Sequence, residues 1–198
     1  MDTFGDHALT CSCGGDRTKR RNLIHNRTHR AALSAGFQTA ELEKPDLPPP
    51  RPRIEGSSED GSTILGDADN NGQRRPADVR RGAPVALDIA VTSGLREDWV
   101  ALSERDPQQV LLQYEGFKCS FLETQRQCLD EGITFVPFVL EAVGGGVGPQ
   151  GAAVIAELAK ITASASGEPA DRSAVSIMQN LQITLHKENA RALLRRHA

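Results

Sequence analysis

The sequence predicts an α/β fold with a mixed sheet, in the order helix, three strands, helix, strand, followed by C-terminal helices. Three observations predict it. Residues 16–35 form an amphipathic segment with helix start and stop signals. Residues 85–92 alternate in the manner of a strand, and a capped helical segment over 106–132 leads into the β-branched run 133–140. With 198 residues, of which 38% are hydrophobic, the chain can bury one domain-sized core.

The first helix is expected over residues 16–35, because Asp16 is a favourable N-cap and Gly36 a favourable stop. Apolar or small residues occupy one face, at Ile24, Thr28, Ala31 and Ala35. The other face is basic, with no acid between Asp16 and Glu41. Its cations are Arg17, Lys19, Arg20, Arg21, Arg27 and Arg30, accompanied by His25 and His29. Such a face suits contacts with nucleic-acid phosphates, and a solvated helix surface is the alternative interpretation.

Residues 37–43 are expected to form a short first strand. Residues 44–73 differ in composition, because they are rich in proline, glycine and acidic residues and contain few large apolar side chains. Such a segment cannot offset the entropy of ordering, so a disordered insertion is predicted.

A carboxylate hairpin is the most informative feature of the chain. In residues 85–92, Leu87, Ile89 and Val91 alternate with small or polar residues, so one face should pack on the core while Asp88 lies on the other. Asp78 precedes Asp88 by ten residues, across a turn expected at 80–83. A carboxylate within an apolar strand needs a cationic partner, and a Mg²⁺ ion shared by the two acids would supply one. This chemistry points to phosphodiester hydrolysis, and two solvated surface aspartates are the alternative.

The second half of the chain is expected to be mainly helical. Asp106 is a predicted N-cap, Pro107 suits the first helical position, and one long helix should continue to Gly132. Its core stripe would be Val110, Tyr114, Phe117 and Phe121, with Leu111, Leu122 and Leu129 beside it. The strand over 133–140 contains Pro137, which favours an edge or a bulge. Helices near 150–161 and 171–195 follow. The last should dock through Val175, Met178, Leu181, Leu185 and Ala192, with Arg191, Arg195, Arg196 and His197 at its end, where cationic side chains complement the helix dipole.

Several functional classes are disfavoured. Residues 146–151 match GxGxxG, but a polar linker and another helix are expected after the following helix, so no dinucleotide cofactor is predicted. No apolar stretch is long enough to span a bilayer, and no signal peptide is evident, so a soluble, intracellular protein without a membrane partner is expected. The formal charge of -3 means that any polyanion site must come from local clustering.

The order of elements, with acids in the second and third strands, resembles the core of the PD-(D/E)xK restriction-like nucleases. Within that superfamily, Arg75-Pro76-Ala77-Asp78 is similar to the K/R-P-D element of endonuclease domains C-terminal to the reverse transcriptases of site-specific non-LTR retrotransposons. The resemblance implies an αβββαβ restriction-endonuclease-like core, DNA as the partner, Mg²⁺ or Mn²⁺ as the cofactor, and a nuclear location.

Two departures from the family pattern bear on activity. Ala77 is inserted between proline and aspartate, and Ala90 replaces the lysine that usually orients the attacking water. Some family members supply this charge from the next helix, where Lys118 is the candidate replacement. An ordinary helix lysine with its amine in solvent is the alternative.

The resemblance also divides the chain into three parts. Residues 1–15 resemble half of a zinc knuckle, with His7 and Cys11 as partial Zn²⁺ ligands and Cys13 nearby, although a closed tetrahedral site lacks a fourth ligand. Residues 16–142 form the nuclease core, and residues 143–198 form a glycine-rich connector and C-terminal helices. The chain would then be a piece of a longer retroelement polyprotein.

The sequence therefore predicts a Mg²⁺-dependent DNA endonuclease. Asp78 and Asp88 would bind the metal, Glu43 would be a further acid, and Lys118 would lie near the scissile phosphate. Nucleic acid would be bound by the basic helix and by Arg75. The alternative is a catalytically inactive nucleic-acid-binding remnant.

Overall fold

The computed structural model describes residues 15–37, 40, 77–81 and 83–197, with the backbone alone for 77–81, 83, 196 and 197. A three-stranded mixed sheet, in the order β1-β2-β3, lies at its centre. Strand β1 (Ala77–Arg81) is antiparallel to β2 (Ala83–Thr92), and β2 is parallel to β3 (Thr134–Glu141). The expected strand over 85–92 is confirmed. Arg80, Arg81 and Ala83 belong to the paired strands rather than to a turn.

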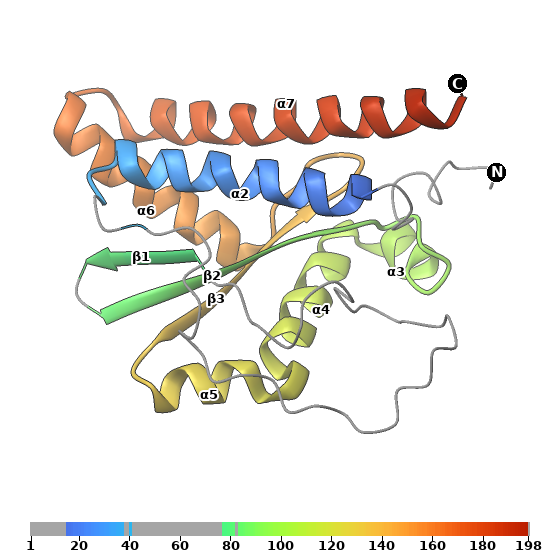
Figure 1. Cartoon of the computed structure of the whole chain (residues 1–198), viewed down its shortest axis with the longest axis horizontal. Helices are drawn as coiled ribbons and strands as arrows, with labels where there is room; N and C mark the ends of the chain where they lie inside the picture. Colours follow the sequence, from blue (N-terminus) through green and yellow to red (C-terminus); the bar gives the residue numbers. More distant parts are fainter. Residues whose placement is uncertain (1–14, 38–39, 41–76, 82, 198) are drawn as a thin grey trace.

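Helices cover both faces of the sheet (Figure 1). On one face lie α2 (Asp16–Ser34), α6 (Pro149–Ser166) and α7 (Ala170–His197). Their buried side chains meet Ile89, Phe138 and Leu140 in the main core cluster, which also contains Ile24, Ile155, Leu181 and Leu185. The other face is covered by α4 (Pro107–Ser120) and α5 (Thr124–Asp130), with α3 (Val100–Arg105) beside α4.

The expectation that only one face of β2 packs on the core is therefore wrong. Ala86 and Ala90, on the same face as Asp88, are buried against side chains of α5 and α4. Their small side chains allow these helices to approach the strand closely. As a result, Asp88 lies beneath a helix rather than in an open groove.

Local signals predicted most helix boundaries. Helix α2 ends where expected, and Gly36 adopts φ +91, as a helix stop requires. Its N-cap is Gly15, so Asp16 is the first helical residue rather than the cap. Asp106 caps α4 as predicted, because its carboxylate accepts from the backbone N–H of Gln108 at 2.9 Å.

The long helix expected over 106–132 is instead broken. A 3₁₀ turn, η2 (Phe121–Glu123), separates α4 from α5, with left-handed backbone at Leu122 (φ 50) and Glu123 (φ 55). This break changes the direction of the chain, so that Cys128 of α5 packs on Ala86 and Phe135 while Leu129 is 70% exposed. The expectation that Leu129 packs beside the core stripe is therefore wrong.

The remaining expectations have mixed outcomes. Helix α6 continues to Ser166, through residues expected to form a linker. Helix α7 follows it, so among residues 134–197 no second strand follows the helix after the GxGxxG match. Pro137 is buried in β3, which is an edge strand among those described, and Val175 is 54% exposed rather than docked. Phe37 and Ala40 are buried beside Leu158 but are not in a strand. The other residues of that expected strand and the insertion at 44–73 lie outside the described residues.

Candidate active site

The hairpin brings the positions of the two aspartates close together. In the β1–β2 register, Asp78 is opposite Ala86, two residues from Asp88 on the neighbouring strand. Because side chains alternate along a strand, positions 78, 86 and 88 belong to the same face of the sheet. The expectation that the two aspartates lie on adjacent antiparallel strands is confirmed for the backbone. The side chain of Asp78 lies outside the described part of the structure.

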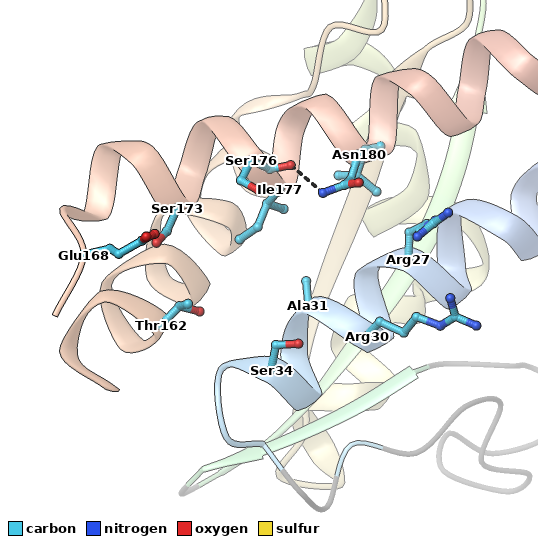
Figure 2. Close-up of a pocket in the computed structure, with 11 residues that line it drawn as sticks. Arg27, Arg30, Ala31, Ser34, Thr162, Glu168, Ser173, Ser176, Ile177 and Asn180 are labelled. Carbon is cyan, nitrogen blue, oxygen red and sulfur yellow. Dashed lines mark hydrogen bonds between the residues drawn. The ribbon is translucent and has the colours of Figure 1, made fainter. Parts of the chain in front are cut away.

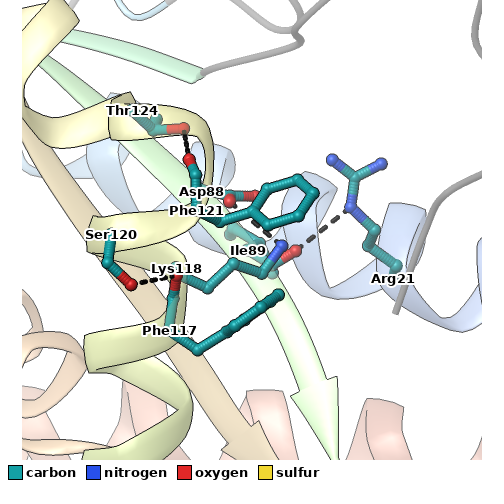
Figure 3. A network of polar contacts seen from close by, with 8 residues as sticks. All are labelled: Arg21, Asp88, Ile89, Phe117, Lys118, Ser120, Phe121 and Thr124. Carbon is teal, nitrogen blue, oxygen red and sulfur yellow. Dashed lines mark hydrogen bonds and ion pairs between the residues drawn. The ribbon is translucent and has the colours of Figure 1, made fainter. Parts of the chain in front are cut away.

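Lys118 forms the principal contact of Asp88. Its Nζ is 3.1 Å from Asp88 Oδ2, and the two side chains are only 17% and 22% exposed (Figure 3). Lys118 lies in the last turn of α4, and its amine is also 5.9 Å from the centre of the Tyr114 ring. The expectation that Lys118 points toward Asp88 from the helix after the strands is confirmed. With Ala86 and Ala90 flanking Asp88 on this face, there is room for the long side chain.

Arg21 connects the basic helix to the same strand segment. The described pairing of β1 with β2 begins at Ala77 opposite Leu87, so Ile89 lies beyond it. Arg21 Nε donates to the Ile89 carbonyl oxygen at 3.1 Å, and its two terminal nitrogens point away from that bond (Figure 3). Helix α2 thus delivers a guanidinium group to the backbone next to Asp88.

Aromatic rings line the side of the site formed by α4. Phe117 and Phe121 lie on either side of the Lys118 chain in Figure 3, with ring centroids 5.1 Å apart. The series continues through Tyr114 to Trp99, with centroid separations of 5.9 and 6.4 Å. Phe117 and Phe121 thus flank Lys118, whose side chain is 17% exposed, and limited exposure to water strengthens an ion pair.

Sequence reasoning missed a buried acid beside this site. Glu115 is 2% exposed, and its Oε1 accepts from the backbone N–H of Gln150 at 3.1 Å, at the N-terminus of α6. Burial raises the pKa of Glu115 above its ordinary value, while hydrogen bonds from the backbone of Gln150 and Gly151 oppose the change. An acid at this location also complements the positive end of the helix dipole. One sequence signal was available, since Glu115 is three residues before Lys118 on the same helix.

Cys119 lies close to both acids. Burial raises the pKa of its thiol, and the negative charges of Glu115 and Asp88 act in the same direction. Its Sγ is 3.9 Å from Gln150 Nε2. That hydrogen bond lowers the pKa of the thiol and so opposes part of the increase.

The basic residues of α2 occupy several environments rather than one face. Arg20 is 4% exposed, and its Nη1 donates to Asn189 Oδ1 of α7 at 2.7 Å, so its expected place on an exposed basic face is wrong. His25 is likewise buried. Lys19, Arg27 and Arg30 are exposed, and Arg17 is half-buried. Glu43, Arg75, His7, Cys11 and Cys13 lie outside the described residues.

The site can be compared with the requirements of Mg²⁺. This ion is bound by one or two carboxylates together with waters and phosphate oxygens. Asp88 offers one carboxylate, and the register puts the position of Asp78 diagonal to it. Within the described ranges, no group of three or more His, Cys, Asp or Glu side chains is arranged to hold a metal. The described part of the site therefore supplies one carboxylate, that of Asp88, to a metal.

Comparisons with known proteins do not identify this chain, because no protein-family model and no curated protein matches it. Among the described helices, none is both long and apolar enough to cross a membrane.

Proposed function

We propose that this chain is a metal-dependent nuclease domain that hydrolyses phosphodiester bonds in DNA at the Asp88–Lys118 site. The observation that carries the proposal is the 3.1 Å ion pair between the two side chains, formed on a sheet face that also includes position 78. A partly buried carboxylate and ammonium, supplied by different elements next to a hairpin acid, form a set of groups suited to phosphoryl chemistry.

Each group has a defined role in the proposed reaction. Asp88, with Asp78, would bind Mg²⁺ or Mn²⁺, which supplies charge neutralisation and an acidified water when bound. The Lys118 ammonium donates a hydrogen bond to a non-bridging phosphate oxygen or orients the water. The water oxygen attacks phosphorus and the water gives up a proton, the bond from phosphorus to the leaving deoxyribose oxygen breaks, and that oxygen takes up a proton. A phosphate monoester and a hydroxyl end result.

Arg21 supports the assignment of a polyanionic substrate. Its Nε is held by the Ile89 carbonyl, so the rest of the guanidinium is oriented before substrate arrives. Two terminal nitrogens remain to contact a phosphate neighbouring the scissile one. Such a contact would place the DNA strand along the N-terminal half of α2.

A cleavage assay on supercoiled plasmid DNA tests the proposal. We expect nicking with Mg²⁺ that stops on chelation. Asp88→Asn should lower the rate at least 100-fold, and Lys118→Met by about 100-fold, in line with the loss of a charged group that acts in the transition state. Lys160→Gln is the matched control, because Lys160 is 68% exposed on α6 and should not affect the rate.

The second candidate function is nucleic-acid binding without cleavage. It is favoured by Ala90, which stands where the resemblance calls for lysine, and by the exposed cations of α2. In that case the wild-type protein would bind DNA with a steep dependence on salt and would not nick it. Nicking that persists in Asp88→Asn would refute the proposed site itself.

A further inference from the structure

A polar pocket lies on the side of the sheet opposite to Asp88. It has a volume of about 290 Å³ and is formed by the C-terminal half of α2, the corner between α6 and α7, and the first turns of α7. Figure 2 shows Arg27 and Arg30 at one end and Thr162, Glu168 and Ser173 at the other, with Ala31 and Ile177 between them. The pocket thus has cationic side chains at one end, apolar side chains in the middle, and two hydroxyl groups and a carboxylate at the far end.

The cationic end is available for a ligand. Arg27 and Arg30 are exposed and one helical turn apart, and neither has an ion pair or side-chain hydrogen bond with another residue in the described part of the chain. Each guanidinium can donate two parallel hydrogen bonds. A carboxylate has two oxygens, and one guanidinium is enough to bond to both of them. A phosphate monoester has three outer oxygens, which can accept hydrogen bonds from both guanidinium groups.

The far end offers neutral and acidic partners. Ser173 is 7% exposed, and its hydroxyl has no side-chain hydrogen bond to any residue that the structure describes. Glu168 faces the same end, with Arg172 Nη1 at 4.0 Å in an exposed contact that contributes little. Thr162 instead donates to the Leu158 carbonyl at 2.8 Å. Glu168 can therefore accept hydrogen bonds from the hydroxyl and amino groups of a ligand, and the Ser173 hydroxyl can accept or donate them.

We infer that this pocket binds a nucleotide through its phosphate, with Arg27 and Arg30 holding the phosphate and the Ser173 end holding the sugar or base. The volume lies at the lower limit for small-molecule sites of about 300 Å³, which suits a mononucleotide better than a larger ligand. The phosphate could belong to a free nucleotide or to the phosphorylated end of a nucleic-acid strand, because the recognised chemistry is the same.

Calorimetric titration of the full chain with adenosine 5′-monophosphate, inorganic phosphate and adenosine tests the inference. We expect the monophosphate to bind at least tenfold more tightly than adenosine. Arg27→Gln and Arg30→Gln should each weaken its binding about tenfold, because each removes a charged hydrogen-bond donor. Arg126→Gln is the control of equal charge change, since Arg126 is 70% exposed on α5.

Ser173→Ala separates the two ends of the pocket. It should weaken binding of the monophosphate but leave binding of inorganic phosphate unchanged, because Ser173 lies away from the arginines. Oligonucleotides with and without a 5′-phosphate distinguish a strand end from a free nucleotide. Equal binding of adenosine and the monophosphate, unchanged binding in both arginine variants, or no binding of any phosphate would overturn the inference. Asp88→Asn should have no effect, so the result is independent of the proposed nuclease activity.

Discussion

Asp88 illustrates how a charged side chain is accommodated within an apolar strand. Its neighbours on the same face are Ala86 and Ala90, and burial of an isolated carboxylate would be costly. Lys118 offsets that cost through an ion pair whose two members are both largely shielded from solvent. Removing one partner of such a pair strongly destabilises the folded state, because the charge of the other partner stays shielded from water without an opposite charge beside it. The ion pair therefore makes a charged side chain at position 88 compatible with the fold.

Glu115 yields a prediction about pH. Because the pKa of Glu115 is raised above 4.5, its carboxyl group binds a proton more readily in the folded state than in the unfolded state. Its contribution to stability is therefore fully present below pH 4.5 and is lost as the pH rises through the folded-state pKa. We expect the wild type to gain unfolding free energy relative to Glu115→Gln when the pH falls from about 7 to about 5.

Denaturant unfolding of both proteins at the two pH values measures this difference. Glu157→Gln is the control, since the Glu157 side chain is 64% exposed, and its difference from the wild type should change little with pH. A Glu115→Gln difference that also stays constant would contradict the prediction.

The loop before α6 shows how one helix sets the geometry of another. Glu115 of α4 reaches the first turn of α6, and a Cβ atom added at Gly148 would lie 2.1 Å from Glu115 Oε1. Gly148 has an ordinary φ of -63, so the constraint is the close approach of the side chain and not the backbone conformation. The glycine at position 148 is thus required by the packing of α4 against the start of α6.

Two glycine substitutions test this interpretation. Gly148→Ala should lower the unfolding free energy by about 1–3 kcal/mol, because the methyl group displaces a buried carboxylate. Gly116→Ala is the matched change within α4, where nothing lies within 4 Å of an added Cβ, and it should raise stability by about 0.5–1 kcal/mol. Thermal or urea denaturation measures both values. If Gly148→Ala is as stable as the wild type, the Glu115 contact does not constrain the loop.

Helices α2 and α7, on the same face of the sheet, both contribute to the main core cluster. Helices α2 and α7 lie side by side in Figure 1, and Arg20 of α2 bonds to Asn189 of α7. Asn189 Nδ2 in turn donates to the Ala142 carbonyl at 2.6 Å, just after β3. One buried polar chain therefore connects the first helix, the last helix and the end of the sheet.

Helix α7 should accordingly be required for stability of the whole fold. Leu185 is fully buried in the main core cluster, and Leu185→Ala should cost about 2–5 kcal/mol of unfolding free energy. Ile183, two residues earlier, is 53% exposed, and Ile183→Ala should change stability by no more than about 0.5 kcal/mol. Chemical denaturation followed by far-ultraviolet circular dichroism distinguishes the two. Similar costs for both would place α7 outside the cooperative core.

The candidate site was only partly predictable from the sequence. Asp88 was identified because a charge interrupts an alternating strand, and Lys118 because its helical position suggested reach toward that strand. The buried position of Glu115 and the hydrogen bond from Arg21 to Ile89 were not predicted. Their partners are 35 and 68 residues away along the chain, and no local pattern records such contacts.

By itself, the sequence determined the local structure. The stop of α2 at Gly36, the cap of α4 at Asp106 and the alternation in β2 follow from backbone conformation and periodicity over a few residues. Tertiary structure alone decided that helices cover both faces of β2, that Arg20 is buried, and that the helix after Asp106 breaks at Phe121–Glu123. Burial and helix direction depend on which distant elements meet, because apolar area and charge are removed from water only where two surfaces pack together.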